Sequence, residues 1–145
     1  MHRKGLAIAV ECQDDRNYNF MEQELKDRTK QFALRIMKLV DALPKTVSAV
    51  AIGRQIVRSG TSVGANYRAA CRGRSKAEFI AKLGLVAEEA DETCFWLELI
   101  VEGGLLPECK IRPLLEEADE LTAIFVSSVK TSRHNHRSLI TDQKS

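Results

Sequence analysis

The chain has 145 residues, a formal net charge of +2, 44% hydrophobic residues and 29% charged residues. This length fits one domain that can bury a core without disulfides or metals, and the small net charge says little about partners. No run approaches the roughly 20 apolar residues that cross a bilayer, and the short apolar run near the N-terminus lacks the pattern of a secretion signal. We therefore expect a cytoplasmic protein with no membrane partner.

The first predicted helix runs from about Glu22 to Leu43, after a flexible N-terminal extension at 1–21. Pro44 ends this helix because the residue before a proline is disfavoured in the α region. Its apolar residues recur at the spacing of one helical face: Phe32, Ile36, Leu39, Val40 and Leu43.

The second predicted helix runs from about Thr46 to Arg72 and carries a row of glycines, Gly53, Gly60 and Gly64. A glycine inside a helix costs about 1 kcal/mol relative to alanine, so three in one helix need a reason. They indicate close approach of a neighbouring backbone, or alternatively a break near Gly60.

The third predicted helix begins at Ser75, a good N-cap with Glu78 three residues later, and ends near Glu102 before Gly103-Gly104. This helix has the clearest apolar periodicity in the chain. The positions alternate three and four apart, with Phe79, Leu83, Val86, Ala90, Cys94 and Leu97 among them.

The last predicted helix follows Pro107 and Pro113, with Pro113 expected in its first turn. Its apolar face reads Leu114, Ala118, Leu121, Phe125 and Val129. The basic tail at 131–145 has no periodicity and is expected to be disordered or frayed. The sequence thus predicts an all-α, antiparallel up-down-up-down four-helix bundle at 22–130.

Catalytic, metal and cofactor motifs are absent from the sequence. The four cysteines, Cys12, Cys71, Cys94 and Cys109, form no C-x-x-C pair and are expected to be reduced. The histidines lie only in the two tails, no Glu-x-x-His occurs, and there is no Walker loop or G-x-G-x-x-G. We expect a protein that is not an enzyme and needs no cofactor.

Charge is strongly segregated along the chain. Positions 42–77 contain no acidic residue, whereas 88–120 contain eleven acids against two basic residues. The basic stretch predicts contact with phosphates of RNA or DNA. Alternatively, it faces the acidic third helix, within one subunit or across a subunit boundary. The candidate nucleic-acid-binding residues are Arg54, Arg58, Arg68, Arg72, Arg74 and Lys76.

A second polar set is expected between the second and third helices. It comprises Asn66, Arg68, Glu88, Glu89 and Glu92, and it indicates a hydrogen-bonded network that fixes helix register or subunit geometry. Trp96 follows Phe95, and neighbours in a helix lie about 100° apart, so one of the two points outward. Trp96 is therefore expected at a subunit interface or, alternatively, at the rim of the core.

One long stretch resembles a known family. The residues Asn66, Arg72 to Ser75, Ser75-Lys76-Ala77-Glu78-Phe79 and Glu88-Glu89-x-x-Glu92 are similar to the pattern of 23S rRNA intervening-sequence proteins, and the resemblance extends from about Phe32 to Val129. It implies a homo-pentamer of four-helix bundles around a channel. A related accessory protein of diversity-generating retroelements binds nucleic acid through a basic surface.

We therefore expect a homo-oligomeric scaffold that binds RNA or DNA weakly and with little sequence preference. The alternative is an adaptor ring that contacts a partner protein and has no nucleic-acid role.

Overall fold

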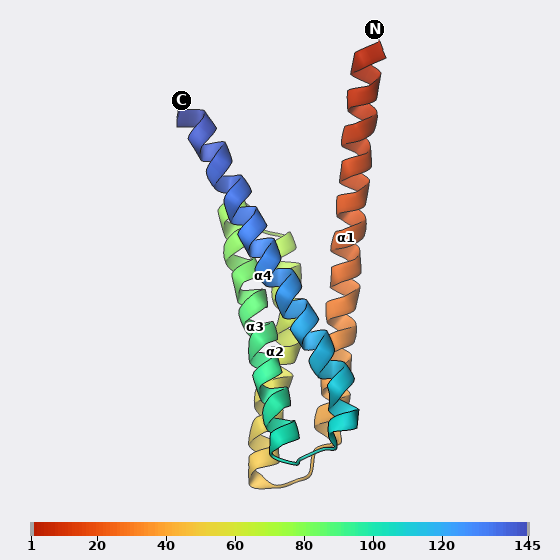
Figure 1. Cartoon of the computed structure of the whole chain (residues 1–145), viewed down its shortest axis with the longest axis vertical. Coiled ribbons are helices and arrows are strands. Elements are labelled where there is room, and N and C mark those ends of the chain that lie inside the picture. Colours follow the sequence, from red (N-terminus) through yellow and green to blue (C-terminus); the bar gives the residue numbers. More distant parts are fainter. Residues whose placement is uncertain (1, 145) are drawn as a thin grey trace.

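The computed structural model describes the backbone at 2–144 and the side chains at 15–144. It contains four helices: α1 (His2–Asp41), α2 (Val47–Cys71), α3 (Lys76–Glu102) and α4 (Glu108–Lys144). Successive helices lie antiparallel and side by side, and α1 and α4 approach each other less closely than these successive pairs do (Figure 1). No strand occurs within 2–144. The prediction of an all-α four-helix bundle is confirmed.

Side-chain and glycine caps set the helix boundaries near the turns. The Thr46 side chain accepts a hydrogen bond from the backbone N–H of Ala49, and the Ser75 side chain accepts one from that of Glu78 at 3.1 Å. At the end of α3 the chain turns through Gly104, whose φ of 66° favours glycine. The predicted start of α3 is therefore confirmed. α1 ends at Asp41, slightly before the predicted Leu43 and ahead of Pro44.

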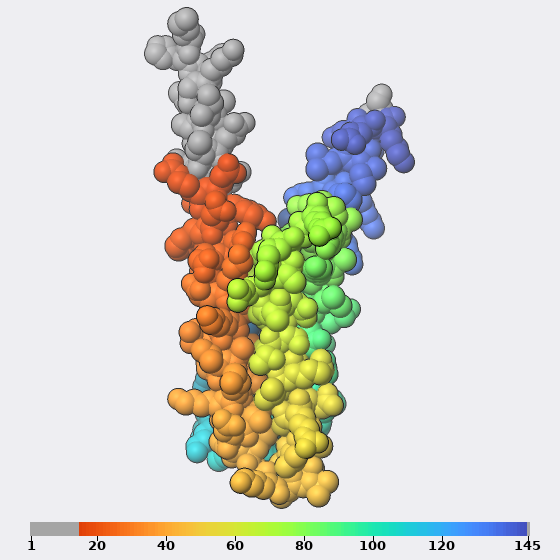
Figure 2. Space-filling view, turned by 180° about the vertical axis from the view of Figure 1, so that it is seen from behind, coloured from red at the N-terminus to blue at the C-terminus, as the bar shows by residue number. Residues whose placement is uncertain are grey.

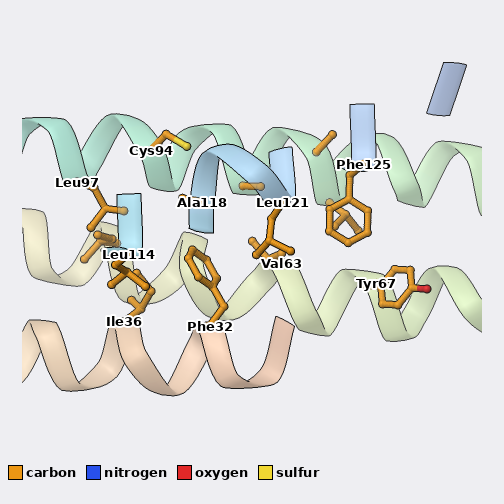
Figure 3. Close-up of a cluster of buried hydrophobic side chains, with 14 of the residues drawn as sticks. Phe32, Ile36, Val63, Tyr67, Cys94, Leu97, Leu114, Ala118, Leu121 and Phe125 are labelled. Atoms are coloured by element: carbon orange, nitrogen blue, oxygen red, sulfur yellow. The ribbon is translucent and has the colours of Figure 1, made fainter. Parts of the chain in front are cut away.

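The core is a continuous apolar column to which all four helices contribute (Figure 3). Phe32 and Ile36 from α1 meet the face of α4, while the rings of Tyr67 and Phe125 lie 5.3 Å apart between α2 and α4. Two buried hydroxyls join α2 to α3, because Thr93 Oγ1 donates a hydrogen bond to Ser59 Oγ at 2.9 Å. This bond fixes the register of the two helices.

The glycine row of α2 packs on α1, and α2 continues without a break at Gly60. A Cβ atom at Gly60 would lie 2.9 Å from two carbons of Ile36, and one at Gly64 would lie 3.2 Å from Thr29 Oγ1. The row therefore serves the close approach of helices that the sequence predicted, and the alternative of a break is wrong.

The structure differs from the sequence prediction at both chain ends. α1 begins at His2 rather than near Glu22, and α4 runs to Lys144 rather than ending near 130. No proline interrupts either segment. Once the packed part of a helix has formed, each added residue costs little, so the helix propagates into polar sequence. The side chains at 1–14, including Cys12 and His2, lie outside the described residues, as does Ser145.

The start of α4 also differs. The helix begins at Glu108, so Pro113 lies in its second turn rather than its first. Proline removes one backbone bond to the residue four positions earlier, which is the exposed Cys109. Buried Ile111 and Leu114 hold this turn against the core and compensate for that bond.

Ion pairs supplement the apolar contacts between α1 and α4. Arg28 on α1 donates to Glu117 at 2.6 Å and pairs with Glu120 at 2.9 Å. The same pairing raises the pKa of Arg28. Beyond this point the two helices diverge toward the end of the molecule where both termini lie (Figure 1).

Three cysteines are described, and all are free: Cys71, Cys94 and Cys109. The buried Cys94 thiol donates to Asp119 at 3.3 Å, and burial raises its pKa to about 12. No helix in the described part of the chain is long and apolar enough to cross a membrane. Within the same residues, no group of three or more metal-ligating side chains is placed to hold an ion.

Candidate nucleic-acid interface

A groove of about 610 Å³ runs along the outer seam between α1 and α2, near the turn that joins α2 to α3. Figure 2 shows this face, with α1 beside α2. Lys26 and Lys30 stand one helical turn apart on α1, and Arg68 and Arg72 stand one turn apart on α2. Two rows of cations therefore face each other across the groove.

Small residues form the floor of the groove: Ala33, Thr61, Gly64 and Ala65. Among the side chains at 15–144, none that lines it is aromatic. One carboxylate, that of Asp27, also reaches the groove, where it accepts a hydrogen bond from Gln23 at 3.0 Å. Four cations against one carboxylate leave the groove with a positive field.

Most of these cations are available to a ligand. Among the described residues, Lys30, Arg68 and Arg72 have no ion-pair partner, and the contact of the Arg72 side chain is a 3.4 Å bond to the Arg68 carbonyl. Lys26 pairs with Glu22 at 2.6 Å within α1. The groove thus holds three unpaired cations and one that is locally paired.

The α2–α3 turn extends the positive surface. Arg74 and Lys76 are both exposed. The Arg74 backbone N–H donates to the Glu78 carboxylate at 3.0 Å, which lowers the pKa of Glu78 and leaves the guanidinium of Arg74 facing solvent. The Lys76 ammonium lies 5.5 Å from the Phe79 ring centroid. The structure therefore brings Arg68 and Arg72 together in the groove. Arg74 and Lys76 lie in the adjoining turn, where Lys76 lines a separate hollow with Tyr67 and Phe79.

Two predicted residues lie elsewhere. Arg54 is near the opposite end of α2, about 27 Å from Arg72 at the rise of an α-helix. Arg58 is engaged by the acidic helix α3, with Glu89 Oε2 at 3.2 Å and a second ion pair to Glu92. This guanidinium holds the pKa of Glu92 below its ordinary value. Among the described cations of α2, Arg58 is thus the one that acidic residues of α3 neutralise within one subunit.

The predicted polar network forms in part. Glu89 and Glu92 belong to it, and Trp96 joins through its Nε1–H, which donates to Glu92 at 3.2 Å. Its cation is Arg58, not Arg68, because Arg68 faces the α1 side of α2. Asn66 and Glu88 form no side-chain hydrogen bond or ion pair within the described residues.

The neighbouring aromatic residues Phe95 and Trp96 differ in exposure. Trp96 is half-buried against the core, whereas Phe95 is 51% exposed and packs edge-on against Trp96. For Trp96 the position at the rim of the core is the one observed in the single chain. The outward-pointing aromatic is Phe95.

Sequence reasoning missed Lys26 and Lys30. They lie far from the basic stretch of α2 along the chain, so linear charge segregation could not reveal them. The available signal was their spacing of four residues beside Thr29 and Ala33, on the side of α1 that must face the glycine row.

These features define an all-α helical bundle protein with a cationic groove on one seam. The chain belongs to the 23S rRNA-intervening sequence protein family, whose model matches residues 21–127. It is similar to a crystal structure of a protein with unknown function from the S23 ribosomal protein family of Bacteroides thetaiotaomicron. The TM-score is 0.68 at 35% identity, over 73% of this chain and 98% of that chain. No protein of curated function shows significant similarity.

Proposed function

We propose that the protein is a non-enzymatic, homo-oligomeric scaffold of the cytoplasm that binds RNA or DNA weakly through the α1–α2 groove and the adjoining turn. The observation that carries this proposal is the set of unpaired cations, Lys30, Arg68 and Arg72, which converge on one groove. Phosphate is the common anion that such rows of lysine and arginine recognise.

The lining of the groove supports binding with little sequence preference. Sequence is read by contacts to base edges or by stacking on aromatic rings, whereas phosphate contacts carry no sequence information. The groove offers cations and a floor of small residues without an aromatic ring. It therefore suits a phosphodiester backbone.

Assembly strengthens such a weak site. The sequence resemblance implies a homo-pentamer, in which one groove per subunit would be repeated around the ring. Repetition of a weak contact on one object raises the overall affinity without any new contact. A pentamer of modest sites would thus bind a long nucleic acid much more firmly than one subunit does.

The test is a filter-binding titration of duplex and single-stranded RNA and DNA at about 50 mM and 200 mM salt. Binding should weaken steeply with salt. The variant Arg68→Glu/Arg72→Glu should lose most of its affinity while its circular dichroism stays helical. It should also flatten the salt slope by about 0.9 for each lost contact to duplex DNA.

The matched control is Arg35→Glu/Lys38→Glu, which reverses the same charge on the distant end of the α1–α4 side. This control should bind nearly as well as the wild type. Salt-independent binding, or equal losses in the two double variants, would refute the proposal.

A second candidate is an adaptor ring that contacts a partner protein and has no nucleic-acid role. The exposed aromatic Phe95 is the observation behind it, since aromatic residues are enriched at protein–protein interfaces. In that case one protein should co-purify stoichiometrically after nuclease treatment, and the purified scaffold should bind no nucleic acid.

A further inference from the structure

The outward side of α3 carries a ridge of apolar and acidic residues centred on Phe95. Leu99 lies one turn later on the same side, and Asp91 and Glu98 flank Phe95 at neighbouring helical positions. Neither Asp91 nor Glu98 forms an ion pair among the described residues. We call Asp91, Phe95, Glu98 and Leu99 the α3 ridge.

A hollow of about 390 Å³ lies on a different side of the bundle, where α1 ends and α2 begins. Apolar residues form most of its wall, and Val50 on its edge is 43% exposed. Its charged members are Lys45, Arg54 and Asp41. The two cations have no ion-pair partner within the described residues. We call this feature the α1–α2 hollow, lined by Val40, Leu43, Lys45, Ala49, Val50, Arg54 and Val57 among others.

The ridge and the hollow have matching chemistry. A large ring beside a leucine faces outward on one surface, and an open apolar depression lies on the other. Unpaired acids surround the ring, whereas the hollow has two unpaired cations against one carboxylate. Both apolar burial and opposite charge would be satisfied if the two surfaces met.

The two surfaces cannot meet within one chain. α3 contacts α2 and α4 but makes no contact with α1, so the hollow lies on the far side of α2 from the α3 ridge. The occupant of each surface must come from another molecule. Because the complementary surface is present on every copy, a second copy of this chain is the fitting partner.

We propose that the α3 ridge of one copy docks into the α1–α2 hollow of the next, with Phe95 as the central buried side chain. This inference rests on the homo-oligomeric assembly of the proposed function and names its contact surfaces. It also gives Arg54 a role separate from the nucleic-acid groove, as a cation facing the acids of the neighbouring ridge.

The heights of the α3 ridge and the α1–α2 hollow along the bundle axis bear on whether repeated contacts give a ring or a filament. The 2.9 Å bond between Thr93 and Ser59 places these residues at one level. Since α2 and α3 are antiparallel, the start of α2 that lines the hollow then lies level with the C-terminal third of α3, which carries Phe95, Glu98 and Leu99 of the ridge. Copies joined at equal levels are not shifted along the bundle axis, so repetition of this contact can close a ring, whereas a shift would build a helical filament. The basic groove lies on the same α1–α2 seam as the hollow, nearer the α2–α3 turn, so the grooves of all copies would lie at one level.

The test measures mass in solution by light scattering for the full chain and two variants. Phe95→Glu replaces the central apolar side chain of the ridge by a charge, and Val50→Glu places a charged side chain at the edge of the hollow. Both residues are exposed in the single chain, so both variants should keep their helical circular dichroism. Each variant alone should fall to the mass of one chain, 16.2 kDa. The control Leu139→Glu alters a residue that is 61% exposed beyond the bundle core, and it should keep the wild-type mass.

Mixing the two variants gives the sharpest outcome. The Phe95→Glu chain keeps its hollow and the Val50→Glu chain keeps its ridge, so the mixture should form a dimer of twice the single-chain mass. A monomeric wild type, variants that stay assembled, or a mixture that stays monomeric would each overturn the inference.

Failure of this inference is distinguishable from failure of nucleic-acid binding. Dispersed variants retain the cations of the α1–α2 groove, so each subunit should still bind nucleic acid weakly and in a salt-dependent way, without the gain from repetition. An assembled wild type that binds no nucleic acid would refute nucleic-acid binding by the groove and would leave the ridge-to-hollow contact supported.

Discussion

The close approach of α2 to α1 at Gly60 makes a quantitative prediction. In Gly60→Ala the added methyl would lie 2.9 Å from both Cγ1 and Cγ2 of Ile36, whereas carbon atoms in contact normally lie about 3.5–4.0 Å apart. Ile36 is fully buried, and its β-branched side chain has one strongly preferred rotamer in a helix, so it cannot turn away.

The expected effect is a balance of two terms. Overpacking a core costs about 1–3 kcal/mol, while replacing glycine by alanine inside a helix gains about 1 kcal/mol. We expect Gly60→Ala to lower the free energy of unfolding by about 1 kcal/mol. Urea denaturation followed by far-ultraviolet circular dichroism, at one fixed protein concentration, measures it.

Gly84→Ala in α3 is the matched control. A Cβ atom there would meet nothing within 4 Å, so only the helix-propensity gain of about 1 kcal/mol applies. The difference between the two variants isolates the steric cost of about 1–3 kcal/mol. Equal changes in stability for the two alanines would refute the packing argument.

Two further predictions concern the α2–α3 seam. Thr93→Val keeps the side-chain shape but removes the bond to Ser59, so it should lower the free energy of unfolding by about 0.5–1.5 kcal/mol in the same denaturation assay. Arg58→Met should make stability less sensitive to acid. Because Arg58 depresses the pKa of Glu92, the pair stabilises the fold above the ordinary glutamate pKa of 4.5, and this contribution is lost as the pH falls through the depressed value. Thermal unfolding from pH 6 to pH 3 should therefore show a steeper loss in the wild type than in Arg58→Met; parallel curves would contradict this.

Sequence reasoning worked where local chemistry decides the structure. The start of α3 follows from Ser75 and Glu78, although the Glu78 carboxylate bonds to the backbone of Arg74 instead of that of the N-cap residue. The apolar period of three and four identified the buried face of each helix, because burial of that face is what holds a bundle together.

The chain ends could not be found in this way. The side chains at 15–20 are all exposed, so this part of α1 has no apolar stripe to reveal a helix. Helix propagation from the packed segment produces it, and that is a property of the neighbouring residues. Likewise, Pro113 led us to expect a later start of α4. The burial of Ile111 compensates for the backbone bond that Pro113 removes, and this tertiary effect cannot be seen in the sequence.

The site was only partly predictable because charge pairing depends on register between helices. The sequence favoured Arg68 as the cation of the polar network, yet Arg58 occupies that place. Arg58 and Glu92 lie equally far from Ser75 along the chain, which is the pairing expected across a tight helical hairpin. Counting outward from the turn would have identified the partner.

The divergence of α1 and α4 has a practical consequence. Both termini lie at the end of the molecule where the α2–α3 turn presents Arg74 and Lys76 (Figure 1). The ends of α1 and α4 project beyond this turn, so a fluorescent label attached at either terminus would stand outside the bundle on the side from which a polyanion reaches the turn. A bulky tag at the same place would instead obstruct that end, so untagged protein is the proper reference for binding measurements.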